Sequence, residues 1–131
     1  MAKFMAPFNA HLYALMRIVV GFTFMCHGAQ KLFGIPSAAP EGIPPFVLYV
    51  GGSIELIGGG LVMIGLMSRW AAFLCSGMMA AAYWMAHGLK APLPISNGGE
   101  LAAVYCFVFL FISAQGAGIW SVEGSRSGAG A

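Results

Sequence analysis

The chain has 131 residues, of which 60% are hydrophobic and 8% are charged. Soluble proteins carry about a quarter charged residues, so this composition excludes an ordinary soluble domain. The net charge of +2 has no basic cluster behind it, which excludes nucleic acid as a partner. A membrane span needs roughly 20 mostly apolar residues, so the chain has room for about four spans.

The first predicted span covers residues 11–34 and follows a short N-terminal segment, residues 1–10. Lys3 before an apolar stretch, with small residues at 37–39, has the outline of a secretion signal. The stretch is too long for the apolar part of such a signal, and it carries Arg17. We therefore expect a span that is retained.

The second predicted span, residues 46–67, follows a pair of prolines, which suit the start of a helix. Residues 70–88 form the third span after a very short turn, and residues 98–118 form the fourth. Short connections force neighbouring helices to be antiparallel. The predicted fold class is all-α, an integral membrane four-helix up-down bundle over residues 11–118. Residues 119–131 are rich in glycine and serine and are predicted to be a flexible tail.

The lysines and arginines predict the orientation in the membrane. Lys3, Arg69 and Arg126 lie on one face, whereas Lys31 and Lys90 lie beside the proline-containing loops on the other. Because cytoplasmic loops carry the excess of these residues, we expect both termini in the cytoplasm. Aromatic residues lie mostly toward the span ends, as in an interfacial belt: Tyr49, Trp70, Tyr83, Trp84 and Trp120.

Glu55 stands in an otherwise uncharged run, residues 47–66, which places its carboxylate near the middle of the bilayer. An ionised group there costs roughly 3 kcal/mol on insertion scales unless it is paired, hydrated or protonated. At about 100° per residue, it shares a helix face with four glycines: Gly51, Gly52, Gly58 and Gly59. Small residues spaced by four let membrane helices pack closely, so another backbone should approach this face.

The first span has a matching face, with His27 at its rim: Arg17, Gly21, Phe24, Gly28 and Lys31. Counting from the shared loop at 1.5 Å per residue, Glu55 lies about 15 Å deep, His27 about 10 Å and Arg17 about 25 Å. These depths predict that Glu55 contacts Arg17 on one side and His27 on the other. Such a group forms either a static pair that joins two helices, or a proton relay or polar substrate site.

Three further polar residues lie at the same membrane face as His27: His87, Asn97 and Glu100. Asn97 and Glu100 have the spacing of a capping box, with Asn97 as the cap and Glu100 at the third helical position. The two glycines between them also suit a turn that binds an anion or a carbonyl at the helix start. We expect His27, Lys31, Glu55, His87 and Glu100 to converge on one cavity that opens on the loop side.

The three cysteines are isolated in apolar segments and are interpreted as small hydrophobic residues: Cys26, Cys75 and Cys106. No CxxC pair is present, and the methionines are interpreted as packing residues, so we predict no metal site.

The polar residues also form a pattern over residues 12–118 that resembles the DoxX family: Arg17…Gly21…His27-Gly28-x-x-Lys31-Leu32, then Gly52-x-x-Glu55-Leu56-x-Gly58-Gly59, Gly65-Leu66-x-x-Arg69, and Asn97-Gly98-Gly99-Glu100 with Tyr105. The resemblance implies a small four-helix protein of the bacterial inner membrane. The family takes its name from a membrane subunit associated with thiosulfate oxidation and quinone reduction. Other members look like membrane partners of redox-defence enzymes, and distant relatives act in cargo export or receptor assembly.

The expected function is therefore a membrane subunit of a quinone-linked oxidoreductase or a redox-stress complex. Glu55, His27 and Arg17 are the predicted catalytic group, and the predicted ligand-binding residues are Lys31, His87, Asn97 and Glu100. The chain holds no cofactor of its own, so a quinone or a partner protein must carry the electrons. The expected partners are the lipid bilayer and either a redox enzyme or a second copy of the chain.

Two alternatives stay open. One is a non-catalytic scaffold or chaperone for another membrane protein. The other is a small proton-coupled transporter, which four short spans form only as an oligomer.

Overall fold

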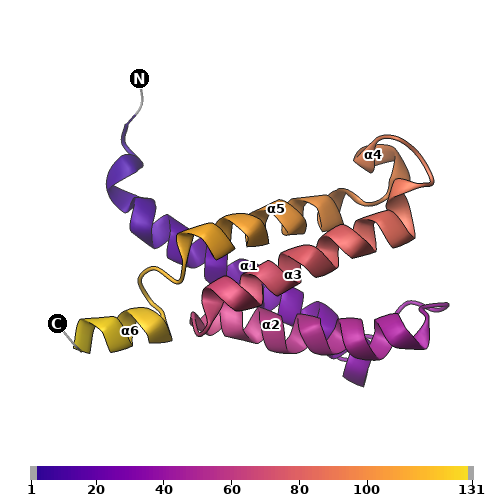
Figure 1. Cartoon of the computed structure of the whole chain (residues 1–131), viewed down its shortest axis with the longest axis horizontal. Coiled ribbons are helices and arrows are strands. Elements are labelled where there is room, and N and C mark those ends of the chain that lie inside the picture. The colour runs from indigo at the N-terminus through magenta and orange to yellow at the C-terminus, as the bar shows by residue number, and fades with distance from the viewer. Residues whose placement is uncertain (1–2, 130–131) are drawn as a thin grey trace.

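The computed structural model describes residues 3–129 and is all-α, which confirms this part of the predicted class (Figure 1). In this part of the chain there are six α-helices: α1 (Asn9–Phe33), α2 (Gly52–Ile64), α3 (Ser68–Tyr83), α4 (Pro94–Asn97), α5 (Glu100–Gln115) and α6 (Val122–Ala129). A short 3₁₀ turn, Ala6–Phe8, precedes α1. Two π-helical segments, η2 (Val47–Gly51) and η3 (Trp84–Gly88), extend the loop-side ends of α2 and α3.

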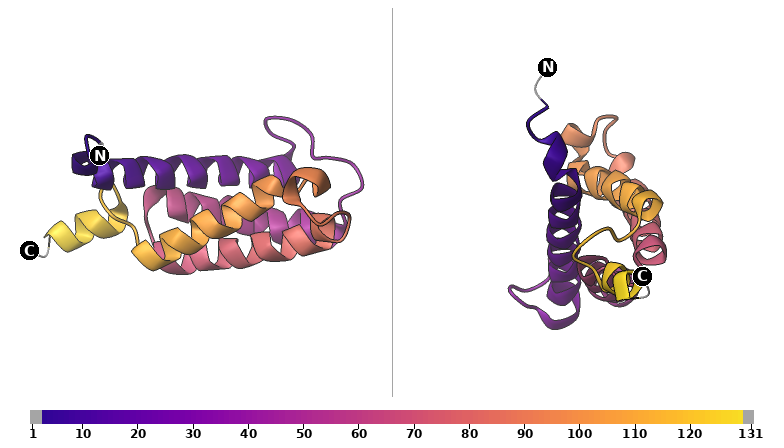
Figure 2. Two further views of the ribbon diagram at one scale, coloured as in Figure 1. Left: turned by 90° about the horizontal axis from the view of Figure 1, so that it is seen from above. Right: turned by 90° about the vertical axis from the view of Figure 1, so that its left-hand side faces the viewer.

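The four long helices run alternately up and down and form two hairpins, α1 with α2 and α3 with α5 (Figure 2). The start of α1, the α2–α3 turn and α6 lie at one end of the molecule. The loop of residues 34–46 and the short helix α4 lie at the other end. A core of buried residues joins the hairpins along their length, and it includes Phe24 of α1, Val62 of α2, Cys75 of α3 and Phe109 of α5.

The glycine faces of α1 and α2 meet, as their spacing predicts. A Cβ atom built on Gly21 would lie 2.6 Å from the backbone nitrogen of Met63, and one built on Gly59 would lie 2.6 Å from that of Met25. Real Cβ atoms essentially never come so close to backbone atoms. The two helices therefore pack backbone against backbone, which only glycine permits at these positions.

The C-terminal segment contains a helix that the sequence does not predict. The sequence predicts a flexible tail over residues 119–131, and within this range the structure has helix α6 over Val122–Ala129. The Glu123 backbone N–H donates to the Gly65 carbonyl at 3.1 Å, and its carboxylate accepts from the Ser68 N–H at 3.1 Å. The start of α6 is thereby fixed to the α2–α3 turn, a contact between distant parts of the chain that local composition does not report. Residues 130 and 131 of the predicted tail, like residues 1 and 2 of the predicted N-terminal segment, lie outside the described residues.

The outer faces of the long helices are strongly apolar. Exposed large side chains lie on all four of them: Leu15, Val19 and Phe22 on α1, Ile57 on α2, Phe73 and Leu74 on α3, and Val104, Phe107 and Leu110 on α5. Soluble monomers rarely expose large apolar side chains on every helix of a bundle. Two helical stretches, Ala6–Phe33 and Val47–Ile64, are long and apolar enough to cross a membrane, and Glu100–Gln115 is a shorter apolar helix.

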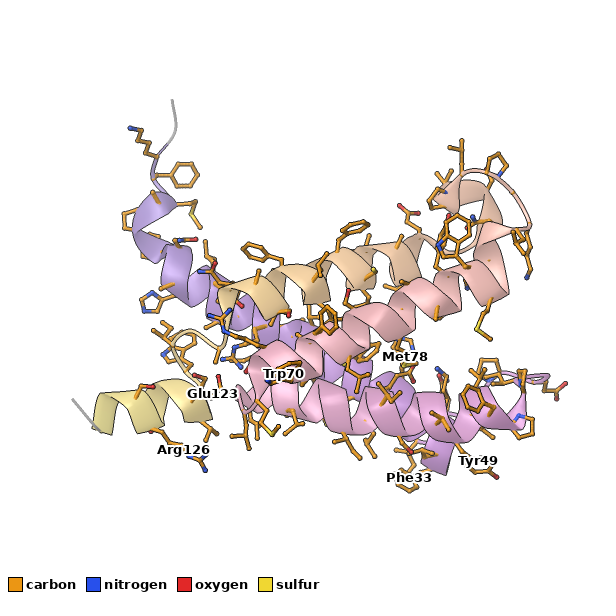
Figure 3. All side chains as sticks on the ribbon, in the orientation of Figure 1. Phe33, Tyr49, Trp70, Met78, Glu123 and Arg126 are labelled. Atoms are coloured by element: carbon orange, nitrogen blue, oxygen red, sulfur yellow. The ribbon has the colours of Figure 1, made fainter. Side chains whose placement is uncertain are left out.

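Exposed aromatic side chains lie near both ends of the molecule. Figure 3 shows Trp70 at the end that holds Glu123, and Tyr49 beside Phe33 at the opposite end. Trp70 is 75% exposed and Tyr49 is 61% exposed. Amphipathic rings in these places match the aromatic belts that the sequence predicts for the two membrane–water interfaces.

Candidate functional site

A cavity of about 840 Å³ lies between the two hairpins at the loop end of the molecule. Its wall includes residues from α1, α2, α3 and α5, from both π-helical segments, and from the loop of residues 34–46. The volume lies in the range of pockets that hold small molecules, roughly 300–1,000 Å³. The cavity therefore combines segments from almost the whole chain at one end of the bundle.

Aromatic packing closes the cavity at its deep end. Phe24 and Tyr105 both line it, and their ring centroids lie 5.3 Å apart in an edge-on arrangement. Directly against them lies Phe109, which is fully buried and 4.7 Å from Phe24 between ring centroids. Because these rings pack in favourable edge and stacked geometries, they form a stable floor. The three rings lie on the side of the cavity that is farther from the loop of residues 34–46.

The cavity wall also contains an ion pair between Lys31 of α1 and Glu55 of α2. The Lys31 Nζ atom lies 2.5 Å from Glu55 Oε1, and the two side chains are 16% and 2% exposed. It is the only ion pair within residues 3–129. The sequence predicts a charged partner for Glu55 and a place for Lys31 in the same cavity, but it does not predict their contact.

The predicted contact between Arg17 and Glu55 is wrong. Arg17 is fully buried near the C-terminal end of α2, at the end of the bundle opposite the loop of residues 34–46. There its guanidinium donates to four backbone carbonyls. Nη1 donates to the carbonyls of Val62 at 2.8 Å and Met63 at 2.6 Å, and Nη2 donates to those of Ile119 at 3.1 Å and Trp120 at 2.7 Å. Arg17 thus joins the C-terminal end of α2 to the segment that leads into α6.

The direction of helical side chains explains the difference. Every Cα–Cβ bond in a helix tilts toward the N-terminus of that helix. Arg17 on α1 therefore leans away from the loop end and away from Glu55. Lys31 leans from the end of α1 down into the bundle, and Glu55 on the antiparallel α2 leans up toward it. The depth of a residue along its helix does not include this tilt. The depth count therefore predicted Arg17 as the partner of Glu55, whereas the structure has Lys31.

One oxygen of Glu55 has no hydrogen-bond partner. Oε1 accepts from Lys31, but Oε2 is buried and unpaired among the described residues. A buried polar atom without a partner costs free energy, about 1–3 kcal/mol and more for a charged group. Glu55 belongs to the cavity wall, but Lys31 and the packed helices cover Oε2 almost completely.

Both predicted histidines line the same cavity. The His27 ring packs edge-on against Tyr105, with 6.2 Å between ring centroids. His87 Nδ1 lies 3.1 Å from the Asn97 carbonyl oxygen. Since a carbonyl only accepts, Nδ1 donates in that bond.

Asn97 and Glu100 lie outside the cavity wall, and the predicted capping box is wrong. Asn97 ends α4, and Gly98 follows with a positive φ of 76°, so the chain turns before α5 begins at Glu100. The Asn97 side chain accepts from the Gly99 N–H at 2.8 Å and donates to Tyr83 and to a backbone carbonyl. Asn97 therefore fixes the loop that positions His87, whereas Glu100 is exposed.

Two charged residues at the cavity mouth were not among the predicted site residues. Glu41 comes from the loop of residues 34–46 and Lys90 from the segment after η3. The four charged residues of the wall are thus two lysines and two glutamates, which balance in formal charge. The two π-helical segments also contribute wall residues, and such segments are frequent at functional sites. Neither segment has a sequence signal that helical periodicity detects.

Three site residues of α5 could have been predicted from helical periodicity in the sequence. Ala102 and Tyr105 line the cavity, and Phe109 closes it from below, so positions i, i+3 and i+7 face the site. This spacing is the ordinary signal of one helix face. Among the described residues, no group of three or more histidine, cysteine, aspartate or glutamate side chains is placed to hold a metal ion.

The structure is a small helical bundle with two stretches long and apolar enough to cross a membrane, and its cavity wall contains a buried glutamate paired with a lysine. The DoxX family model matches residues 12–88, and the chain belongs to this family. It is similar to an uncharacterized protein of Haemophilus influenzae, with 38% identity over 122 residues that cover 88% of this chain and 91% of the relative. A Bacillus subtilis protein with the description "Putative oxidoreductase CatD" is 41% identical over 59 residues, 42% of this chain and 44% of the relative. No solved structure matches the chain.

Proposed function

We propose that the chain is a four-span inner-membrane subunit of a quinone-linked oxidoreductase or redox-stress complex, and that the cavity binds the ring of the quinone. The single observation that carries this proposal is the Lys31–Glu55 ion pair in the wall of a largely apolar cavity. The oxidoreductase description of the Bacillus subtilis relative supports the redox class. It covers less than half of either chain, so the cavity bears the main argument.

The cavity suits a neutral ring with polar oxygens. Its wall is apolar along Met79, Ala82 and Leu101, where a hydrocarbon ring would pack. The charged wall residues balance one another, so a ligand with a net charge gains no attraction over a neutral one. The Lys31 ammonium has three N–H donors and uses one for Glu55, so it is a hydrogen-bond donor for a carbonyl oxygen.

The residues present therefore fit a quinone, which when bound supplies a two-electron, two-proton redox couple that dissolves in the bilayer. Lys31 is placed to orient one oxygen of the ring, and its pairing with Glu55 fixes the position of the ammonium group. His27 and His87 lie in the same wall.

The same floor argues against the transporter alternative, because a solute path needs an exit that Phe24, Tyr105 and Phe109 close. The scaffold alternative has one favourable observation. Gly77 lies exposed on α3 with nothing within 4 Å of an added Cβ atom, which leaves a flat spot for a partner helix. A redox partner enzyme is compatible with both functions.

A pair of tryptophan variants tests the proposed site. Ala82 lines the cavity, whereas the adjacent Ala81 is exposed on the outer side of α3. We expect Ala82→Trp to fill the cavity and to weaken the binding of a short-chain quinone to the purified protein at least tenfold. Ala81→Trp is the matched control and should bind as the wild type does.

Tryptophan fluorescence or calorimetric titration in mild detergent measures the affinity, and thermal unfolding confirms that both variants are folded. Equal quinone affinity in Ala82→Trp and the wild type would place the binding elsewhere. No measurable binding to the folded wild type would remove the quinone proposal and favour the scaffold function.

A further inference from the structure

Helices α1 and α5 form the one loosely packed side of the bundle. At the other three sides the long helices pack closely, α1 with α2, α2 with α3 and α3 with α5, whereas the backbones of α1 and α5 barely touch. A hydrogen bond crosses between them at mid-height, from the Tyr105 hydroxyl to Thr23 Oγ1 at 2.8 Å. The seam between α1 and α5 is thus closed by side chains and not by packed backbones.

A second cavity, of about 510 Å³, borders the same two helices at the other end of the molecule. Its wall comes from the first half of α1, the end of α5 and the residues that follow α5. The apolar part of this wall consists of Leu12, Met16, Phe111 and Ile119, and no charged side chain is among its described residues. The seam therefore has the loop-end cavity with Lys31 at one end and an uncharged cavity at the other.

An apolar stripe of α5 runs along the seam between the two cavities. Leu101 lines the loop-end cavity and Phe111 lines the second one, and each shares its cavity with residues of α1. Val104 and Val108 lie between them at the spacing of one helix face. Leu101, Val104 and Phe111 are exposed, so the stripe is accessible from the outside of the bundle. At 1.5 Å per residue it is about 15 Å long.

We propose that the hydrocarbon tail of the quinone leaves the loop-end cavity between α1 and α5, lies along this stripe and ends in the second cavity. The inference rests on the proposed function, and it names the ligand class as a ring with a long apolar tail. The loop side offers no equivalent place, because Glu41 and Lys90 lie there and a tail beside them would remain in contact with water. Along the seam, the tail exchanges lipid contacts for contacts with apolar side chains.

The test compares two probes with the same ring, a methyl-substituted benzoquinone without a tail and one with a tail of about four isoprene units. Ala10 lines the second cavity, so the indole of Ala10→Trp fills it and leaves the loop-end cavity unchanged. Ala114 is exposed on α5 outside both walls, which makes Ala114→Trp the matched control.

We expect Ala10→Trp to weaken the binding of the tailed probe about fivefold or more, because the tail loses its packing contacts in the second cavity. The probe without a tail should bind Ala10→Trp as it binds the wild type, and Ala114→Trp should bind both probes normally. All affinities are measured with the full chain in one mild detergent, so the partition of each probe into the detergent is the same for every variant. Thermal unfolding confirms that the variants are folded.

A photoreactive group at the end of the tail gives a second measurement that needs no variant. In the wild type we expect it to label residues 9–16 and 111–119. Label on residues 34–46 instead, or equal affinity of the tailed probe for Ala10→Trp and the wild type, overturns this inference and leaves the proposed function intact. If neither probe binds the folded wild type, both the inference and the proposed function fall.

Discussion

At the scale of single residues, the two buried cations of α1 have different tasks. Lys31 neutralises the Glu55 carboxylate in the wall of the cavity. Arg17 holds four backbone carbonyls at the opposite end, where the partial negative charge of the α2 C-terminus favours a cation. A planar guanidinium with five donors suits the second task, and a compact ammonium suits the first.

Removal of Lys31 should destabilise the protein because it leaves the Glu55 charge buried and unpaired. We expect Lys31→Met to lower the free energy of unfolding by about 3 kcal/mol, the usual cost of breaking a buried ion pair. The double variant Lys31→Met/Glu55→Met removes both charges and should recover most of that loss. Thermal unfolding of the purified variants in one detergent measures both effects. A single variant as stable as the wild type would show that the pair contributes nothing.

Arg17 should not tolerate replacement by lysine. The ammonium of Arg17→Lys keeps the charge but cannot reach the carbonyls of α2 and of residues 119–120 with a rigid fork. We expect a lower unfolding temperature and faster proteolysis within residues 119–129, because Arg17 no longer holds this segment to α2. Limited proteolysis followed by mass spectrometry locates the cut. Cleavage at the wild-type rate would contradict the assigned role of Arg17.

At the scale of helices, the contact between α1 and α2 depends on glycine. The glycine spacing on each face predicts this contact, and the all-α class and the four long helices follow from composition and turn residues. The polar site was predicted only in part. The helix faces predicted the residue types of the site and a cavity near the loops. The Lys31–Glu55 contact, the π-helical segments and the α6 contact depend on side-chain tilt and long-range packing, which local patterns do not encode.

Two glycine-to-alanine variants test the close approach of α1 and α2. Gly21→Ala places a methyl group against the backbone of Met63, which cannot move cheaply, and should cost about 1–3 kcal/mol of stability. Gly77→Ala on the open face of α3 meets nothing within 4 Å and should be neutral or stabilise the helix by up to about 1 kcal/mol. Equal unfolding temperatures for the two variants would contradict backbone contact at Gly21.

At the scale of the whole molecule, the two ends of the helical bundle differ in structure. One end is closed by Arg17, Arg69 and Glu123, which bond the backbone at the ends of α2, α5 and α3. The other end holds the cavity and its charged mouth. The distribution of lysine and arginine predicts that the closed end faces the cytoplasm, so the cavity opens toward the exterior.

Cysteine labelling tests this orientation. In a variant without Cys26, Cys75 and Cys106, we expect Glu41→Cys to react with a membrane-impermeant thiol reagent in intact spheroplasts. Ser125→Cys on α6 should react only after the membrane is permeabilised. The opposite pattern would invert the proposed topology, and labelling of both in intact cells would contradict an up-down bundle with its ends on opposite sides.

The most direct test of the central claim is photolabelling of the purified wild type with an azido-substituted quinone, followed by peptide mapping. We predict that the label appears on the cavity wall within residues 79–87 and 98–105, is displaced by unlabelled quinone, and disappears in Ala82→Trp but not in Ala81→Trp. Label confined to the outer apolar faces, or unchanged in Ala82→Trp, would contradict a quinone site in the cavity.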